Sequence, residues 1–297
     1  MKNVTSFGEI LFDVYPGFKK LGGAPFNFIY HIKKLTGYGN FISRIGNDKT
    51  GNEIVNFMIN HDMSTKYVQI DNENPTGSAS ANLDRNKIPH WEIELNQAYD
   101  FIEYSQRLTS LIEEETDCLY FGTLAQRGEQ SRKTLQSLFC KRIKYFCDLN
   151  LRQNFYNVET IKSSLSAANV LKLNNDELKI VNNLLLKNKV DEFQLAKILS
   201  EYFEIDLVCI TQGENGAMLY KDGIMNHYKS EVENVVDTVG AGDAYAAMLC
   251  LGYLNGWSLE KTNKLASEFA GKIIMVNGAL PENDFLYDNF IQTNILS

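Results

Sequence analysis

The chain has 297 residues, of which 44% are hydrophobic and 22% are charged, and its formal net charge is -8. These proportions are ordinary for a globular protein and exclude a disordered or fibrous chain. The negative charge disfavours a nucleic acid partner, because a phosphate backbone would be repelled. A wound α/β sheet can carry a chain of this length as one unit, so we expect a single domain over residues 1–297.

The cysteines and the N-terminal segment exclude several further classes. The five cysteines are odd in number and show no C-x-x-C spacing, so neither a disulfide framework nor a zinc site is expected. Glu9 and Asp13 interrupt the apolar N-terminal segment, and no run of about 18 apolar residues occurs in the chain. We therefore expect a cytoplasmic protein without a membrane partner.

The first segment combines a strand with polar residues in positions suited to ligand binding. Residues 4–11 read as a buried strand that runs into Asp13, and open α/β sheets bind ligands just past the C-terminal ends of their strands. The pair Gly22-Gly23 then precedes a helix that carries Asn27. Asn27 is either a solvent-facing polar residue or an amide that clamps adjacent hydroxyls, since a carboxamide both donates and accepts hydrogen bonds.

Residues 41–45 read as a second strand, followed by the turn GNDKTGNEIVNFM. Asn52 stands where a phosphate loop of the GxxxxGK type has lysine, so that motif fails and a structural turn is favoured.

From residue 75 the pattern changes, because TGSASANLD and KIPHWEIEL alternate with period two around a turn at residues 84–86. The alternation predicts a β-hairpin outside the βα rhythm, and such an insertion suggests a small lid.

Strands predicted at 118–121, 144–149, 170–173 and 205–211 alternate with helices, which indicates a mainly parallel sheet with helices on both faces.

Polar residues follow the ends of these strands. Arg152 is either a surface residue or a guanidinium near a phosphate or sugar, and we favour the second reading. Asn174 with Glu177 is first of all a helix-capping arrangement. The glycines of the stretch Thr211-Gln212-Gly213-Glu214-Asn215-Gly216 predict a tight turn.

The stretch DTVGAGDAY, from Asp237 to Tyr245, carries the strongest chemical signal. Gly240 and Gly242 lack a Cβ, so consecutive N–H groups can point outward and cradle an anion. The apolar helix that follows favours negative charge at its N-terminus. Asp243 is either a helix-start residue or a base that accepts a hydroxyl proton while the amides stabilise a phosphoryl group. Further on, residues 259–276 read as a helix that stops at the glycine of Asn277-Gly278.

DTVGAGDAY resembles the C-terminal signature of the ribokinase-like, or PfkB, family of carbohydrate kinases, and GGAPFN resembles its N-terminal signature. Four residues depart from the commonest forms of these signatures, at positions where packing or the backbone matters most: Ile29, Thr36, Val239 and Met248. The resemblance covers nearly the whole chain. It implies an α/β, ribokinase-like wound, mainly parallel sheet with helices on both faces, plus a small β-strand lid formed by residues 12–21 and 75–98.

The resemblance also implies an activity and roles for particular residues. The fragments PTG, PHWEI, FGTLAQR and DLNLRQNFY are similar to the fructokinase branch, so we expect an ATP:sugar phosphotransferase that makes fructose 6-phosphate. In this reading Asp243 is the base, the amides of Gly240, Ala241 and Gly242 stabilise the γ-phosphoryl charge, and the sugar is held by Asp13, Gly22, Gly23, Asn27 and Arg152. The residues expected to border ATP are Asn174, Glu177, Thr211, Gly213, Gly216 and Asn277.

The cofactors expected from the resemblance are Mg²⁺, held by Glu177 through water, and a monovalent cation such as K⁺ near Asp237. Two lids could pair in a homodimer. Other readings stay open: a kinase for ribose, a nucleoside or 2-keto-3-deoxygluconate, or a sugar- or nucleotide-binding regulator that has kept the fold without turnover.

Overall fold

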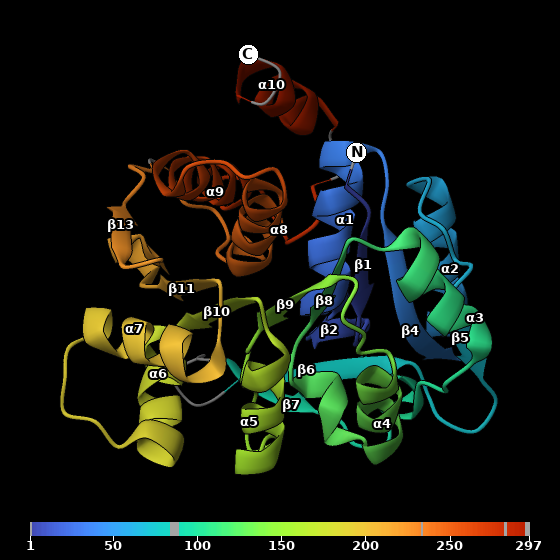
Figure 1. Cartoon of the computed structure of the whole chain (residues 1–297). Coiled ribbons are helices and arrows are strands. Elements are labelled where there is room, and N and C mark those ends of the chain that lie inside the picture. Colours follow the sequence, from blue (N-terminus) through green and yellow to red (C-terminus); the bar gives the residue numbers. More distant parts are fainter. Residues whose placement is uncertain (1, 84–88, 233, 282–283, 295–297) are drawn as a thin grey trace.

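The structure is a computed structural model that describes residues 2–83, 89–232, 234–281 and 284–294. Within these residues a sheet of nine strands forms the centre of the molecule (Figure 1), in the order β13-β12-β11-β10-β9-β8-β1-β4-β5. Neighbouring strands pair in parallel from β11 to β5, whereas β12 and β13 are added at one edge by antiparallel pairing. The strands are β1 (Val4–Phe7), β4 (Asn40–Gly46), β5 (Val68–Asp71), β8 (Cys118–Phe121), β9 (Lys144–Asp148), β10 (Val170–Asn174), β11 (Leu207–Thr211), β12 (Ala217–Lys221) and β13 (Ile224–Tyr228).

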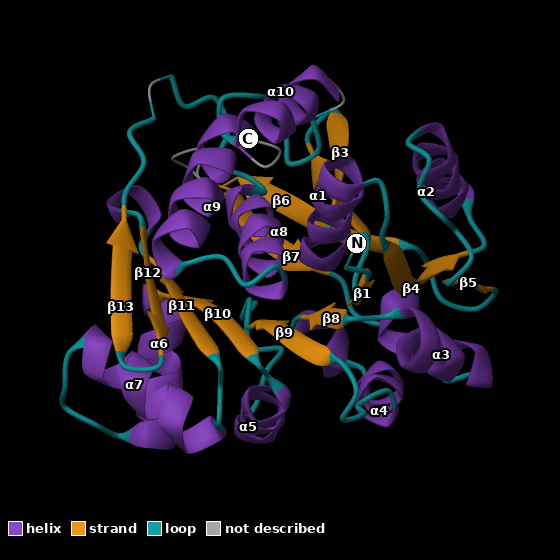
Figure 2. Cartoon of the chain, turned by 45° about the horizontal axis from the view of Figure 1, so that its top comes forward, coloured by secondary structure: helices purple, strands orange, loops and turns teal. Residues whose placement is uncertain are grey.

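Helices cover both faces of this sheet (Figure 2), because successive strand side chains point to opposite faces. In β8, Cys118 and Tyr120 join one apolar core, and Leu119 and Phe121 join the other. The first core packs under α1 (Ala24–Thr36), α2 (Lys49–Asn60), α8 (Ala241–Leu254), α9 (Leu259–Ile273) and α10 (Asp284–Asn294). The second packs under α3 (Gln106–Ser110), α4 (Glu129–Ser137), α5 (Val158–Ala167), α6 (Asn175–Val181) and α7 (Glu192–Phe203). The expected fold class is therefore confirmed.

A second, four-stranded sheet lies apart from the main one, in the order β3-β2-β6-β7. Its strands are β2 (Leu11–Tyr15), β3 (Phe18–Gly22), β6 (Gly77–Leu83) and β7 (Pro89–Ile93). β6 and β7 pair antiparallel, as the alternation predicted, and the predicted turn at residues 84–86 lies outside the described residues. We call this element the small sheet.

The prediction of one strand over residues 4–11 is wrong. The chain leaves the main sheet after Phe7 and enters the small sheet at Leu11. Gly8 makes the change of direction, because its φ of 147° is rare for residues with a side chain. As a result Asp13 lies within a strand of the small sheet and not just past a strand of the main sheet.

Other predicted element ends also need correction. Helix α9 stops at Ile273, before the predicted glycine stop, and its C-cap residue Ile274 keeps right-handed helical geometry. The turn after β4 has the expected structural role, because the Asp48 side chain caps α2 by accepting a hydrogen bond from the Gly51 amide. In the described part of the chain, no helix is long and apolar enough to cross a membrane.

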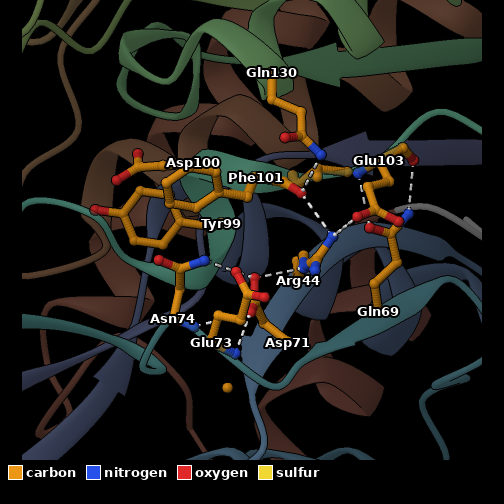
Figure 3. A network of polar contacts seen from close by, with 12 residues as sticks. Arg44, Gln69, Asp71, Glu73, Asn74, Tyr99, Asp100, Phe101, Glu103 and Gln130 are labelled. Atoms are coloured by element: carbon orange, nitrogen blue, oxygen red, sulfur yellow. Dashed lines mark hydrogen bonds and ion pairs between the residues drawn. The ribbon is translucent and has the colours of Figure 1, made fainter.

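A polar network fastens the segment after the small sheet to β4 and β5 (Figure 3). Arg44 on β4 forms ion pairs with Asp71, at 2.7 Å between Nε and Oδ2, and with Glu103, at 2.7 Å between Nη1 and Oε1. Arg44 also donates a 2.9 Å hydrogen bond to the Phe101 carbonyl. These contacts fix the turn that carries Tyr99, whose ring borders Gly77 at the start of β6.

Candidate active site

The N-terminus of α8 forms the predicted anion-binding turn. Gly240 is the N-cap with φ 81°, and a Cβ there would lie 2.4 Å from the Ala279 Cβ, so only glycine fits. The Ala241 amide donates to the Thr238 carbonyl at 3.3 Å. Within the described part of the chain, the amides of Gly240 and Gly242 have no acceptor. Together with the helix dipole, these free N–H groups favour an anion at this turn.

Asp243 lies in the first turn of α8 beside these amides and is partly buried. Its Oδ2 accepts a 2.7 Å hydrogen bond from Asn27 Nδ2 on α1. Loss of surrounding water, helped by the negative charge of Asp148, raises the pKa of Asp243 to about 6. The Asn27 hydrogen bond and the positive charges of Lys172 and Arg152 oppose this rise. A carboxylate with such a pKa is ionised at neutral pH and accepts a proton more readily than an ordinary aspartate.

Of the residues expected to hold a sugar, Asn27 contacts this carboxylate and Arg152 interacts electrostatically with both Asp243 and Asp13. Asn27 is 4% exposed, and its Oδ1 has no hydrogen-bond partner among the residues that the structure describes. Asp13 Oδ2 lies 3.1 Å from the place where a Cβ on Gly22 would stand, and burial raises the pKa of Asp13 to about 6. Arg152 is exposed, but its charge lowers the pKa of Asp13 and of Asp243, so it lies near both. Gly23 is the N-cap of α1.

Glu9 is a buried carboxyl beside this group that the sequence did not single out. It is 2% exposed, and its Oε2 has no partner within the described residues. Burial raises the pKa of Glu9 to about 7. The charge of Arg152 lowers this pKa, whereas the charge of Asp243 raises it. The segment Gly8 to Ile10, where the chain changes sheets, carries this residue. Glu9 therefore adds a second unsatisfied acceptor next to Asn27 and Asp243.

A buried ion pair beneath the glycine turn was also missed. Lys172 Nζ lies 2.8 Å from Asp148 Oδ2 and 3.0 Å from its Oδ1, and the Tyr120 hydroxyl donates to Asp148 Oδ2 at 3.0 Å. The same Nζ lies 3.5 Å from the place where a Cβ on Gly242 would stand. These side chains come from neighbouring strands β8, β9 and β10. They place a buried ion pair under the anion-binding turn, with the Lys172 ammonium on the side of Gly242.

The expected ATP-bordering residues of β10 and β11 lie together at the ends of these strands. Asn174 pairs with Thr211 in the parallel register, and Gly213 and Gly216 bound the turn that follows Thr211. Asn174 caps α6 by accepting from the Glu177 amide at 2.9 Å, which confirms the capping arrangement. Asn277 is not in this group and lies in the loop after α9, where its Oδ1 accepts from Lys20 at 2.6 Å.

Glu177 limits how a magnesium ion could bind. Its Oε1 accepts from the Leu151 amide at 2.7 Å and its Oε2 from the Asn174 amide at 2.8 Å, so each oxygen retains one free lone pair. No group of three His, Cys, Asp or Glu side chains that could hold a metal occurs among the described residues. This donor set fits Mg²⁺ held by phosphates and water, with Glu177 reached through a water molecule.

The fold places the chain among kinases of the ribokinase-like class. A sugar kinase from Pyrococcus horikoshii, described in complex with ATP, is 25% identical with a TM-score of 0.79, over 93% of this chain and 94% of that one. A double mutant of the Vibrio cholerae fructokinase, described with fructose, ADP and a potassium ion, shares the fold at 20% identity, with a TM-score of 0.76 over 97% of this chain and 98% of that one.

The family follows from the sequence comparison. The model of the pfkB family of carbohydrate kinases matches residues 17–284, so this chain belongs to that family and is a sugar phosphotransferase. Among its curated relatives, an ATP-dependent 6-phosphofructokinase from Thermoanaerobacterium thermosaccharolyticum is 26% identical over 272 residues, which are 88% of this chain and 81% of the relative. The Escherichia coli fructokinase is 26% identical over 240 residues, which are 78% of this chain and 76% of the relative.

Proposed function

We propose that this chain transfers the γ-phosphoryl group of ATP to a primary hydroxyl of an uncharged sugar, and that D-fructose is its best acceptor. The observation that carries the proposal is the 2.7 Å hydrogen bond that fixes Asp243 beside the free amides of the glycine turn. Asn27 binds one carboxylate oxygen and leaves the other free for a hydroxyl. A base and an anion site in contact are what transfer to a hydroxyl requires.

In this mechanism Asp243 accepts the proton of the acceptor hydroxyl as its oxygen attacks the phosphorus. The amides of Gly240 and Gly242 donate hydrogen bonds that stabilise the negative charge developing on the transferred group. The Lys172 ammonium lies beneath them. Bound Mg²⁺ would neutralise charge on the ATP phosphates. Asn174 and Thr211 would border the nucleotide from the ends of β10 and β11, as the family resemblance implies.

The unpaired atoms around Asp243 support an uncharged acceptor. Asn27 Oδ1 and Glu9 Oε2 are buried acceptors without a donor among the described residues, and Asp13 is a further carboxylate that the Arg152 charge affects. Sugar hydroxyls supply donors, whereas a phosphate group of the acceptor would meet these oxygens with oxygens of its own. The small sheet, with Asp13 on β2, would act as the lid over the sugar. Pairing of two small sheets in a homodimer, and one domain over residues 1–297, stay predictions.

A second candidate acceptor is fructose 6-phosphate, because the first relative described above is named a 6-phosphofructokinase. Arg152 is the observation in favour, since its guanidinium makes no hydrogen bond or ion pair with the described residues and could receive a phosphate. The fructokinase relative and the unpaired oxygens weigh towards the free sugar.

The experiment is a coupled assay of ADP release with ATP and a panel of acceptors: D-fructose, fructose 6-phosphate, tagatose, ribose, adenosine and 2-keto-3-deoxygluconate. We expect D-fructose to give the highest kcat/KM, with the new phosphate on O6. A tenfold advantage for another acceptor would reject fructose and keep the sugar kinase. No ADP above background hydrolysis with any acceptor would favour the alternative of a binding protein without turnover.

A further inference from the structure

Lys20 reaches from the small sheet to the loop that leads into the glycine turn. It lies on β3, directly opposite Asp13 in the antiparallel register. Its Nζ is 2.9 Å from Asp237 Oδ2 and 2.6 Å from Asn277 Oδ1. The Lys20 side chain is 28% exposed and that of Asp237 is 18% exposed, so water screens this pair only partly. One ammonium therefore joins the small sheet to the loops on both sides of α8 and α9.

The family resemblance implies a monovalent cation near Asp237, and the residues present do not fit one. Asp237 Oδ1 accepts from the Val239 amide at 3.1 Å. Asp237 Oδ2 accepts from both the Gly278 amide, at 3.1 Å, and Lys20. Although burial would raise it, the Lys20 ammonium and these amides hold the pKa of Asp237 below its usual value. The carboxylate already has donors on both oxygens and a positive partner.

A potassium ion beside the same carboxylate would stand next to the ammonium and be repelled by it. It would also compete with Lys20 for the oxygens of Asp237 and Asn277. We propose that the Lys20 ammonium is the resident cation of the Asp237 loop, and that this kinase neither binds K⁺ there nor needs it for turnover. Because Lys20 lies on β3, the positive charge that holds the loop before Gly240 is part of the small sheet. The position of that loop therefore depends on the position of the small sheet.

The part of the proposal that concerns turnover rests on the proposed function, so the first test needs no substrate. Thermal unfolding is followed in KCl and in tetramethylammonium chloride at equal ionic strength, for the wild type, Lys20→Met and Lys19→Met. Lys19 is a matched control, because it neighbours Lys20 on β3 but pairs with Glu53 at 2.5 Å. For the wild type, the unfolding temperature should be the same in the two salts. The same should hold for the control, Lys19→Met. Lys20→Met should unfold at a lower temperature in tetramethylammonium and recover in KCl.

The second test measures kcat with ATP, Mg²⁺ and the best acceptor over a KCl series. The wild-type rate should change less than twofold. Lys20→Met should lose at least tenfold without K⁺ and recover severalfold with K⁺ or methylammonium. A wild-type rate or unfolding temperature that rises clearly with K⁺ would overturn the proposal, and so would a Lys20→Met protein equal to wild type in both salts. Absence of turnover in the wild type would count against the proposed function alone, because the unfolding test still decides the cation.

Discussion

Asn27 Nδ2 donates a 2.7 Å hydrogen bond to Asp243 Oδ2 across 216 residues of chain. The bond joins the first turns of α1 and α8, which both begin at glycine N-caps. It holds the Asp243 carboxylate in one orientation, and it leaves Asn27 Oδ1 as a buried atom that a substrate hydroxyl can satisfy. The two helix starts thus form one site, in which the base and a sugar-binding amide are positioned by each other.

The pH dependence of kcat/KM should show this coupling. Burial raises the pKa of Asp243 to about 6, and a base works only when ionised, so kcat/KM should fall tenfold per pH unit below about pH 6. Asn27→Ala removes a hydrogen bond to the carboxylate, so the acid limb should move to higher pH. The measurement is kcat/KM as a function of pH, from about pH 5 to about pH 9, a range that includes the pKa of Asp243.

Two other buried carboxyls could add ionisations of their own, since burial raises the pKa of Glu9 to about 7 and that of Asp13 to about 6. Asn27 donates to Asp243 and not to these two, so the shift in Asn27→Ala assigns the limb to Asp243. Glu9→Gln keeps Asp243 and should keep the acid limb near pH 6. A limb that stays in place in Asn27→Ala, or that disappears in Glu9→Gln, would contradict the role of Asp243.

Replacement of Asp13 by Ala should affect the sugar far more than the nucleotide. Loss of the hydrogen-bond partner of a sugar hydroxyl in a partly buried site weakens binding of the sugar by about 1 to 3 kcal/mol. This free energy corresponds to a rise in the sugar KM of roughly 5- to 150-fold. The KM for ATP should change less than twofold. Steady-state kinetics with each substrate varied in turn make the comparison, and an equal rise in both constants would mean that the fold was damaged.

The buried pair of Lys172 and Asp148 gives a prediction about stability. Lys172→Met leaves the Asp148 carboxylate, which is 2% exposed, without its charge partner, at a cost of about 3 to 5 kcal/mol. The double variant Lys172→Met with Asp148→Asn removes the stranded charge and should recover most of that loss. Urea unfolding followed by circular dichroism measures both. A double variant no more stable than Lys172→Met would show that charge burial does not govern this position.

The fold could be predicted because its signals are local. Strand Cys118–Phe121 has the predicted bounds, since a short apolar run between polar segments has one stable place in a wound sheet. The apolar run from residue 4 to residue 11 misled the prediction, because it spans two sheets and the change depends on Gly8. A single glycine in an apolar run is a weak signal, but it was the one available.

The sequence points to the candidate site where motifs mark it and not where strands assemble it. Asp243 and Asn27 stand in two glycine-containing signatures. Lys172 and Asp148 are polar residues inside apolar strands, 24 residues apart, and only the pairing of β9 with β10 brings them together. Lys20 looks like an ordinary surface lysine in FKKLGG, because its partners Asp237 and Asn277 are more than two hundred residues away.

The central claim is that Asp243 is the proton acceptor in transfer of a phosphoryl group to a sugar hydroxyl. The most direct test is kcat of Asp243→Asn with ATP and the best acceptor, with ATP binding measured by calorimetry on the same protein. We predict that kcat falls by about 10²- to 10⁴-fold, the usual worth of general-base catalysis, while ATP binds as in the wild type. A variant that binds ATP normally and keeps a kcat within threefold of the wild type would contradict the account.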